Sequence, residues 1–152
     1  MCIRDSNQPN RGTQTFAITE LIDMFPSICE LANVPVPDYM QGTSFVPLVK
    51  NPEQPWKKAA FSQFHRRPKV SADGKRYMGY VINTDEYHYI EWYAWNAKKG
   101  ERGAFKTAEL YDAINDEHET INLANDDNYA PQIALLSKQL AAGWKAALPP
   151  VQ

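Results

Sequence analysis

The sequence YMGYVINTDEYHYIEWYAW, residues 77–95, indicates how this chain folds. Aromatic and β-branched side chains are enriched in β-strands because they pack well on a pleated surface. The first run is Tyr77–Asn83, and the second extends from Tyr87 to Trp92 or Trp95. Two such runs joined by a short turn, here Thr84-Asp85-Glu86, predict a β-hairpin.

The residues on either side of this hairpin predict two more strands and a helix. Ala59–Phe64 is a strand candidate, and Ala108–Tyr111 is a short one. Asn96–Thr107 is polar, basic and glycine-containing, so we expect a mobile loop there. Pro131 opens a helix that Pro149 ends, with an apolar face. That face is formed by Ile133, Leu136, Leu140, Trp144 and Ala147. The expected fold class is therefore α+β, with about four antiparallel strands packed against one C-terminal helix.

Residues 15–50 carry helical signals that are separate from the predicted sheet. We expect Asp23 to cap a short helix with Pro26 in its first turn. Asn33 lies where a residue of left-handed conformation commonly ends a helix. Cys29, on the apolar helix face, is expected to be a buried free thiol.

The proline-containing stretch 51–55 predicts a boundary between two parts of the chain. Just before it, Phe45–Val49 predicts a second helical piece, capped by Thr43 or Ser44. We therefore assign residues 7–52 to the end of one domain and residues 53–150 to a C-terminal subdomain.

The first six residues, MCIRDS, resemble a translated sequencing adapter of the kind found in metagenomic libraries. We interpret residues 1–6 as an artefact, so that the true N-terminus would lie upstream. The chain has 152 residues, 43% of them hydrophobic and 22% charged, which is typical of a globular domain. The formal net charge of −2 gives no electrostatic reason to expect nucleic acid as a partner. No apolar run approaches the roughly 20 residues that span a bilayer.

Five strings, in order along the chain, resemble the C-terminal end of sulfatases, most closely of the iduronate-2-sulfatase type. They are Glu20–Ala32 (ELIDMFPSICELA), Gln41–Leu48 (QGTSFVPL), Trp56–Phe64 (WKKAAFSQF), Met78–Trp92 (MGYVINTDEYHYIEW), and Glu109–Asp112 (ELYD) with Asp116, Glu119 and Asn122–Ala124. Each string alone is weak, but together they cover most of residues 15–125.

The resemblance implies a C-terminal fragment of an enzyme that hydrolyses sulfate esters of a sulfated polysaccharide or glycosaminoglycan. Residues 7–52 would then close an α/β large domain of the alkaline-phosphatase-like superfamily. Such enzymes use a formylglycine, made in a C-x-P-S-R motif, and usually a calcium ion. No C-x-P-S-R motif occurs in this chain. We therefore expect the catalytic formylglycine and calcium in the missing N-terminal domain, an inactive fragment, and an exported parent protein.

The best candidates for substrate contact are His65, Arg66 and Arg67, which follow a predicted strand. Two guanidinium groups suit bidentate binding of sulfate or carboxylate. The resemblance places this loop near the active-site cleft, although a solvated basic loop is the simpler interpretation. Trp92 is added as an aromatic surface that a sugar ring could stack on.

Other polar residues are better explained by structure than by chemistry. His88 and His118 have no Cys or His partner at metal-ligand spacing. The acidic stretch from Asp112 to Asp127 lacks the spacing of a calcium loop, so we predict no metal site and interpret Asp116 and Glu119 as turn and cap residues.

Two alternatives stay open. The chain could be a stand-alone carbohydrate-binding α+β module, or part of a related phosphoesterase of the same superfamily. The fragment hypothesis makes a structural prediction: residues 16–49 should expose apolar surface, giving poor solubility. A shorter chain beginning near Glu53 should behave better.

Overall fold

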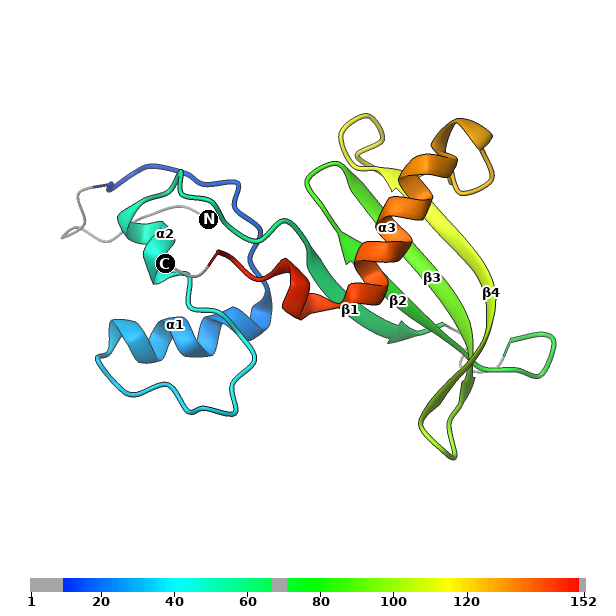
Figure 1. Ribbon diagram of the computed structural model, residues 1–152, viewed down its shortest axis with the longest axis horizontal. Coiled ribbons are helices and arrows are strands. Elements are labelled where there is room, and N and C mark those ends of the chain that lie inside the picture. The colour runs from blue at the N-terminus through cyan, green and yellow to red at the C-terminus, as the bar shows by residue number, and fades with distance from the viewer. Residues whose placement is uncertain (1–9, 67–70, 151–152) are drawn as a thin grey trace. The chain divides into compact units, whose positions relative to one another are not determined.

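Four antiparallel strands form one sheet, and a helix lies across one face of it (Figure 1). The computed structural model describes residues 10–66 and 71–150. The strands are neighbours in chain order: β1 (Ala60–His65), β2 (Tyr77–Asn83), β3 (Tyr87–Asn96) and β4 (Glu101–Asp112). The helix, α3 (Ala130–Ala142), comes last. The expected α+β class is confirmed.

The central hairpin forms where the aromatic runs predict it. β2 pairs with β3 from Tyr77↔Ala94 to Asn83↔His88. Thr84 closes the turn, because its Oγ1 accepts a hydrogen bond of 2.9 Å from the Tyr87 N–H. Its own N–H donates to the Tyr87 carbonyl at 2.9 Å.

The prediction of a mobile loop at Asn96–Thr107 is wrong, because most of this segment belongs to β4. The pairing of β3 with β4 continues through Trp95↔Arg102, with register shifts near Tyr93. Arg102 lies over the Tyr93 ring, with its Cζ 4.5 Å from the ring centroid. The Phe105 and Tyr93 rings meet edge to face at 5.6 Å. The polar residues of β4 are thus held by aromatic side chains of the preceding strands, which local composition does not reveal.

The core between α3 and the sheet uses the apolar face that the sequence predicts. Its buried residues are Ala59, Ile82, Tyr89, Leu110 and Leu136, with Ile133, Leu140 and Ala147 packed against them. The helix is shorter than predicted, because Gly143 adopts a positive φ of 76°. The predicted last turn is instead a separate 3₁₀ helix, η3 (Trp144–Ala147).

Residues before the sheet form short helices near the predicted positions. A 3₁₀ helix, η1 (Leu21–Asp23), leads into α1 (Met24–Leu31), and α2 (Val46–Lys50) follows. Asn33 has a left-handed φ of 56°. Its N–H donates to the Glu30 carbonyl at 3.1 Å, and the Val34 N–H donates to the Cys29 carbonyl at 2.8 Å. This pair of hydrogen bonds is the Schellman ending that asparagine tolerates. The residue that precedes α2 is Phe45, and not Thr43 or Ser44 as predicted, although Ser44 Oγ accepts from the Val46 N–H at 3.2 Å.

The chain divides into two compact units. Unit 1 extends to Lys58 and includes the segment from Leu148, and unit 2 is Ala59–Ala147. The sequence-based boundary at residues 52/53 falls inside unit 1, and the assignment of residues 1–6 as an artefact lies outside the described residues. Within residues 10–66 and 71–150, no helix has the length and apolar character needed to cross a bilayer.

Candidate functional site

The predicted basic loop begins at the end of β1, and the structure separates its members. His65 is the last residue of β1, Arg66 follows it, and Arg67 lies outside the described residues. The Arg66 N–H donates to the Tyr77 carbonyl at 3.0 Å, which fixes the backbone as it leaves the sheet. The guanidinium Cζ of Arg66 lies 5.9 Å from the centroid of the Trp92 ring. The structure therefore brings Arg66 and Trp92 together.

His65 contacts a different aromatic residue. Its ring centroid is 6.0 Å from that of Trp95, in an edge-to-face arrangement. Successive side chains of a strand point to opposite faces of a sheet. For this reason Phe64 can contact Trp92 while His65, the next residue, contacts Trp95.

Trp92 is buried, which leaves little of its ring exposed to a sugar. Only 6% of the residue is exposed. Its ring lies against Gly79, where an added Cβ would come within 3.0 Å of it. Phe64 packs edge to face at 5.2 Å, and the indole Nε1–H donates to Glu109 Oε1 at 2.8 Å. The Trp92 ring thus lies against the Arg66 guanidinium group, and substrate contact by either residue stays a prediction.

Arg66 stacked on a fixed aromatic ring is suited to binding anions. A guanidinium group keeps its charge at all physiological pH values and offers donors in a planar fork. Stacking over an indole ring orders the side chain without removing its charge. The arrangement can hold a sulfate or carboxylate group, and it has no nucleophile.

Tyrosine hydroxyls and carboxylates are paired on both faces of the sheet. Tyr111 donates to Glu109 Oε2 at 3.0 Å, and burial, followed by this bond, raises the pKa of Tyr111 to about 12. Tyr89 and Tyr93 donate to the buried Glu91 at 3.1 and 2.6 Å. Burial, followed by the charge of Glu91, raises the pKa of Tyr89. These tyrosines keep their protons near neutral pH, so they act as hydrogen-bond donors.

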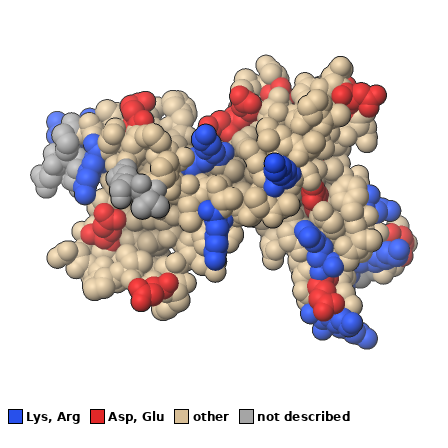
Figure 2. Space-filling view, viewed as in Figure 1, with Lys and Arg blue, Asp and Glu red and all other residues tan. Residues whose placement is uncertain are grey.

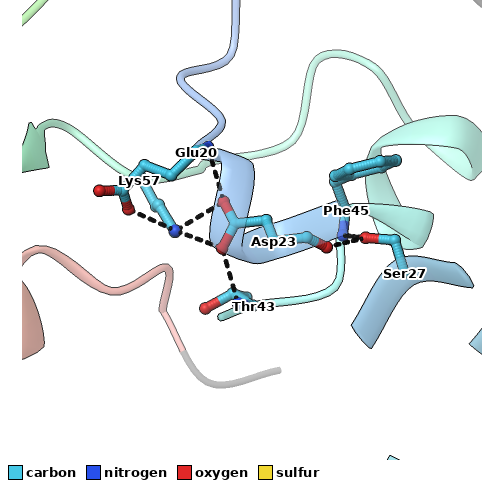
Figure 3. A network of polar contacts seen from close by, with 6 residues as sticks. All are labelled: Glu20, Asp23, Ser27, Thr43, Phe45 and Lys57. Atoms are coloured by element: carbon cyan, nitrogen blue, oxygen red, sulfur yellow. Dashed lines mark hydrogen bonds and ion pairs between the residues drawn. The ribbon is translucent and has the colours of Figure 1, made fainter. Parts of the chain in front are cut away.

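A buried ion pair organises unit 1 (Figure 3). Lys57 Nζ lies 2.8 and 2.7 Å from the two carboxylate oxygens of Asp23, and 2.9 Å from Glu20 Oε2. Asp23 is fully buried and Lys57 is 6% exposed. The same carboxylate accepts from the backbone N–H groups of Glu20 (2.9 Å) and Thr43 (2.7 Å). Asp23 therefore joins the segments that contain Glu20, Thr43 and Lys57. The sequence predicted only a helix cap at this position.

Hydrogen bonds of Ser27, also drawn in Figure 3, extend this network. The Ser27 hydroxyl donates to the Asp23 carbonyl at 2.6 Å and accepts from the Phe45 N–H at 2.9 Å. The side chains of Asp23 and Ser27 are fully buried, and each has the hydrogen-bond partners that a buried polar group requires. Sequence patterns had given no signal for this pairing across the chain.

Unit 1 exposes a large apolar surface around α1, as predicted for residues 16–49. Phe16 is 93% exposed and Leu21 86%. Other large apolar residues at least one third exposed are Ile22, Met24, Phe25, Ile28, Leu31, Val34, Val36 and Tyr39. We call this set the α1 surface. Single exposed apolar residues are ordinary, but a continuous series of this length is typical of an interface.

The remaining candidate residues, His88, Cys29 and Asp116, have roles in the fold. His88 Nδ1 lies 2.7 Å from Glu119 Oε1, and Cys29 is a buried free thiol, as expected. Asp116 accepts from the Thr120 hydroxyl and the Ile121 N–H at 3.0 and 2.8 Å, which is the predicted turn role. In the part of the chain that the structure describes, no three His, Cys, Asp or Glu side chains gather as a metal site. We assign no metal-dependent step to these residues.

Comparison with known families and structures places these features in context. The family of N-sulphoglucosamine sulphohydrolase C-terminal domains matches residues 1–145. The solved structure of BT4656 in complex with its substrate D-glucosamine-2-N,6-O-disulfate is similar, with a TM-score of 0.67 and 26% identity. The similarity covers 90% of this chain and 26% of that one.

Two curated relatives are sulfatases of very different organisms. An N-acetylglucosamine-6-O-sulfatase of Bacteroides thetaiotaomicron is 27% identical over 133 residues, covering 86% of this chain and 22% of the relative. Human arylsulfatase K is 27% identical over 123 residues, covering 74% of this chain and 20% of the relative. The chain therefore spans about a fifth of the length of the curated relatives it matches.

Proposed function

The chain belongs to the family of N-sulphoglucosamine sulphohydrolase C-terminal domains, and we propose that it is the C-terminal part of a sulfatase acting on a sulfated sugar. Its role would be to complete a larger catalytic domain through unit 1 and to contribute the sheet of unit 2 to that enzyme. The catalytic group, a formylglycine, and a calcium ion would belong to the preceding part of the protein. The chain alone would then be inactive.

The α1 surface is the observation that carries this proposal. Burial of apolar area contributes roughly 25 cal/mol per Å², so a series of exposed Phe, Leu and Ile side chains represents unused stabilisation. Met24–Leu31 is helical and has a well-formed hydrogen-bonded end, so its exposure is not a sign of an unformed helix. The curated relatives are about four times as long as this chain, and we propose that the domain preceding this segment in the longer protein covers the α1 surface.

Two substrate classes are candidates for the parent enzyme. One curated relative and the similar structure are named for sulfated glucosamine, which favours a glucosamine sulfate. The five sequence strings instead favour an iduronate-2-sulfatase-like enzyme acting on glycosaminoglycan. Both are sulfated sugars with an anionic group that Arg66 could bind, and the two differ in the ring that carries the sulfate.

The test is the activity of the longer protein, expressed from the source DNA with its upstream sequence. We expect sulfate release from a sulfated hexosamine or hexuronate, measured by ion chromatography for each substrate separately. Ile28→Asp, in the α1 surface, should abolish activity by preventing domain assembly. The matched change Ile114→Asp, on a similarly exposed isoleucine of unit 2, should leave it unchanged. Release of phosphate and not sulfate would favour the related phosphoesterase.

A further inference from the structure

A groove lies at one end of the sheet, where β2 begins and the β3–β4 hairpin turns. Its volume is about 690 Å³, within the roughly 300–1,000 Å³ typical of small-molecule sites. Its lining includes Ala94, Trp95 and Gly103 on the strands, which we call its floor, and Lys75, Arg76 and Lys98 in the adjoining turns, which we call its rim. We call it the hairpin groove.

The floor is fixed by close backbone contacts. The Trp95 N–H donates to the Arg76 carbonyl at 2.9 Å, which ties the start of β2 to β3. Gly103 lies so near β3 that an added Cβ would come within 3.2 Å of the Ala94 carbonyl oxygen. The Trp95 ring is half-buried and held edge-on by His65. An ordered aromatic ring and small neighbours are what an apolar sugar face requires.

The rim is formed by two hydrogen-bonded turns. Gly74 donates to the Ser71 carbonyl at 2.9 Å, and Ser71 donates to the Lys75 carbonyl at 2.8 Å. On the other side, Asn96 Oδ1 accepts from the N–H groups of Lys98 and Lys99, each at 3.2 Å. The backbone that carries each cation is therefore ordered before any ligand binds, which lowers the entropic cost of binding.

The charge of the groove is positive. Lys75, Arg76 and Lys98 are exposed, and the ion pairs among the described residues involve Lys57 and His88 instead. The carboxylate of Asp73 is engaged by the Tyr77 hydroxyl at 2.6 Å and the Lys75 N–H at 3.1 Å. Figure 2 shows Lys and Arg atoms, with some acidic atoms among them, in the lower right part of the view, where the hairpin tip lies.

We propose that the hairpin groove is a subsite for an anionic saccharide, with Trp95 against a sugar ring and Lys75, Arg76 and Lys98 on its sulfate or carboxylate groups. This inference rests on the proposed function, a sulfatase that acts on a sulfated sugar. It adds that the sulfated sugar is part of an oligosaccharide and not an isolated monosaccharide. The groove is separate from the Arg66–Trp92 pair, since none of its lining residues belongs to that pair.

A single-stranded nucleic acid also combines anionic groups with rings that stack on aromatic residues. Nucleic-acid binding depends on many phosphate contacts across a basic surface. This chain has a net charge of −2, and the groove holds three cations around one aromatic ring. These features favour one charged sugar unit of an oligosaccharide over a polynucleotide.

The test measures binding to the whole 152-residue chain, immobilised on a sensor so that self-association does not contribute. The probes are a heparin-derived tetrasaccharide, its desulfated counterpart, inorganic sulfate, and a single-stranded oligonucleotide of equal charge. We expect the tetrasaccharide to bind best. Trp95→Ala should weaken it at least tenfold, and the double variant Lys75→Ser, Lys98→Ser should weaken it similarly and reduce its dependence on salt.

The double variant changes only exposed side chains, so it keeps the test valid if Trp95→Ala fails to fold. Lys138→Ser, an exposed lysine of α3, is the matched control and should bind normally. The proposal is overturned by equal binding of the desulfated probe, by preferred binding of the oligonucleotide, by binding of sulfate alone, or by undiminished binding in the double variant.

The subsite and the proposed function can fail separately. If the longer enzyme releases sulfate while the groove variants bind normally, the subsite fails and the proposed function stands. If the groove variants lose saccharide binding but the longer protein releases no sulfate, the subsite stands and the proposed function fails.

Discussion

At the scale of single residues, Asp23 holds unit 1 together. Its carboxylate contacts Lys57 and two backbone N–H groups, and its own carbonyl accepts from Ser27. A buried charge is tolerated only when its partners replace water, and this carboxylate has three partners, Lys57 and two backbone N–H groups. Lys57, 34 residues further along the chain, is thereby fixed against the start of α1.

Replacement of Asp23 should therefore destabilise unit 1 strongly. Asp23→Ala leaves the buried ammonium group of Lys57 with Glu20 as its remaining acid partner, and we expect a loss of roughly 3–5 kcal/mol in the free energy of unfolding. Urea unfolding followed by circular dichroism measures it. Lys58→Ala, on the exposed neighbour of Lys57, should change the free energy by less than about 0.5 kcal/mol. Equal effects of the two changes would contradict the central role of Asp23.

The sequence placed Asp23 correctly before α1, but its side chain makes no cap hydrogen bond to that helix and binds Lys57 instead. An acidic residue before Pro26 is a familiar helix-start signal, and local spacing was enough to suggest a cap. The partner lies far away in the chain, and nothing in a single sequence connects Asp23 to Lys57. By contrast, Asn33 was predicted correctly because the left-handed conformation depends only on neighbouring residues.

At the scale of elements, the acidic segment after β4 is a series of hydrogen-bonded turns. Asp112 accepts from the N–H groups of Ile114 and Asn115 at 3.0 and 2.9 Å, and from the Asn115 side chain at 2.8 Å. The Asn115 side chain is the main cause of the lowered pKa of Asp112. For Asp116, the bond from the Ile121 N–H is the main cause of its lowered pKa.

This segment should make the stability of the chain sensitive to acid. A lowered pKa in the folded state means that the carboxylate stabilises the fold above the pKa of the unfolded chain, and that this stabilisation disappears as the pH falls. We expect the free energy of unfolding to decrease as the pH drops below about 4. Asp116→Ala should be less stable at neutral pH and show a shallower decrease. A decrease as steep as in the original chain would show that Asp116 is not a contributing group.

The outer part of the β3–β4 hairpin is a strand that the local amino-acid composition does not predict. Glu101–Thr107 has the polar residues of a loop, yet it pairs with β3 because Arg102 and Phe105 pack on Tyr93. β2 and the start of β3 were predictable because their own aromatic residues favour extended structure. β4 was not, because its partners are supplied by another strand.

Hydrogen exchange should distinguish a strand from a mobile loop in this segment. Backbone amides of β4 that face β3 should be protected, and Arg102→Ala should reduce that protection. Loss of a cation–π contact of roughly 0.5–1 kcal/mol corresponds to about a two- to fivefold change in exchange rate. Lys99→Ala, in the adjoining turn, should have no effect. Unprotected amides in the original chain would restore the loop interpretation.

At the scale of the whole molecule, the α1 surface sets the behaviour of the chain in solution. Exposed apolar residues extend from Phe16 to Tyr39, whereas unit 2 buries a continuous core around Leu136. A free apolar surface of this kind promotes self-association. The chain therefore has one unit with a continuous apolar core and one whose apolar residues around α1 are largely exposed.

We accordingly expect the 152-residue chain to self-associate, as analytical ultracentrifugation would measure. Ile28→Ser with Leu31→Ser should lower the association, because both residues belong to the α1 surface. Ile114→Ser with Ile121→Ser, equally exposed in unit 2, should not. A chain beginning near Glu53 should stay monomeric. A monomeric full chain that unfolds cooperatively would count against a missing partner domain.

The central claim is that this chain continues a longer sulfatase, and the coding DNA upstream of Ser6 tests it most directly. A long read through the source DNA should show an uninterrupted frame that encodes a C-x-P-S-R or S-x-P-S-R motif and the acidic ligands of a metal site. A stop codon, followed by a genuine start near residue 7, would contradict the claim and leave a small binding module.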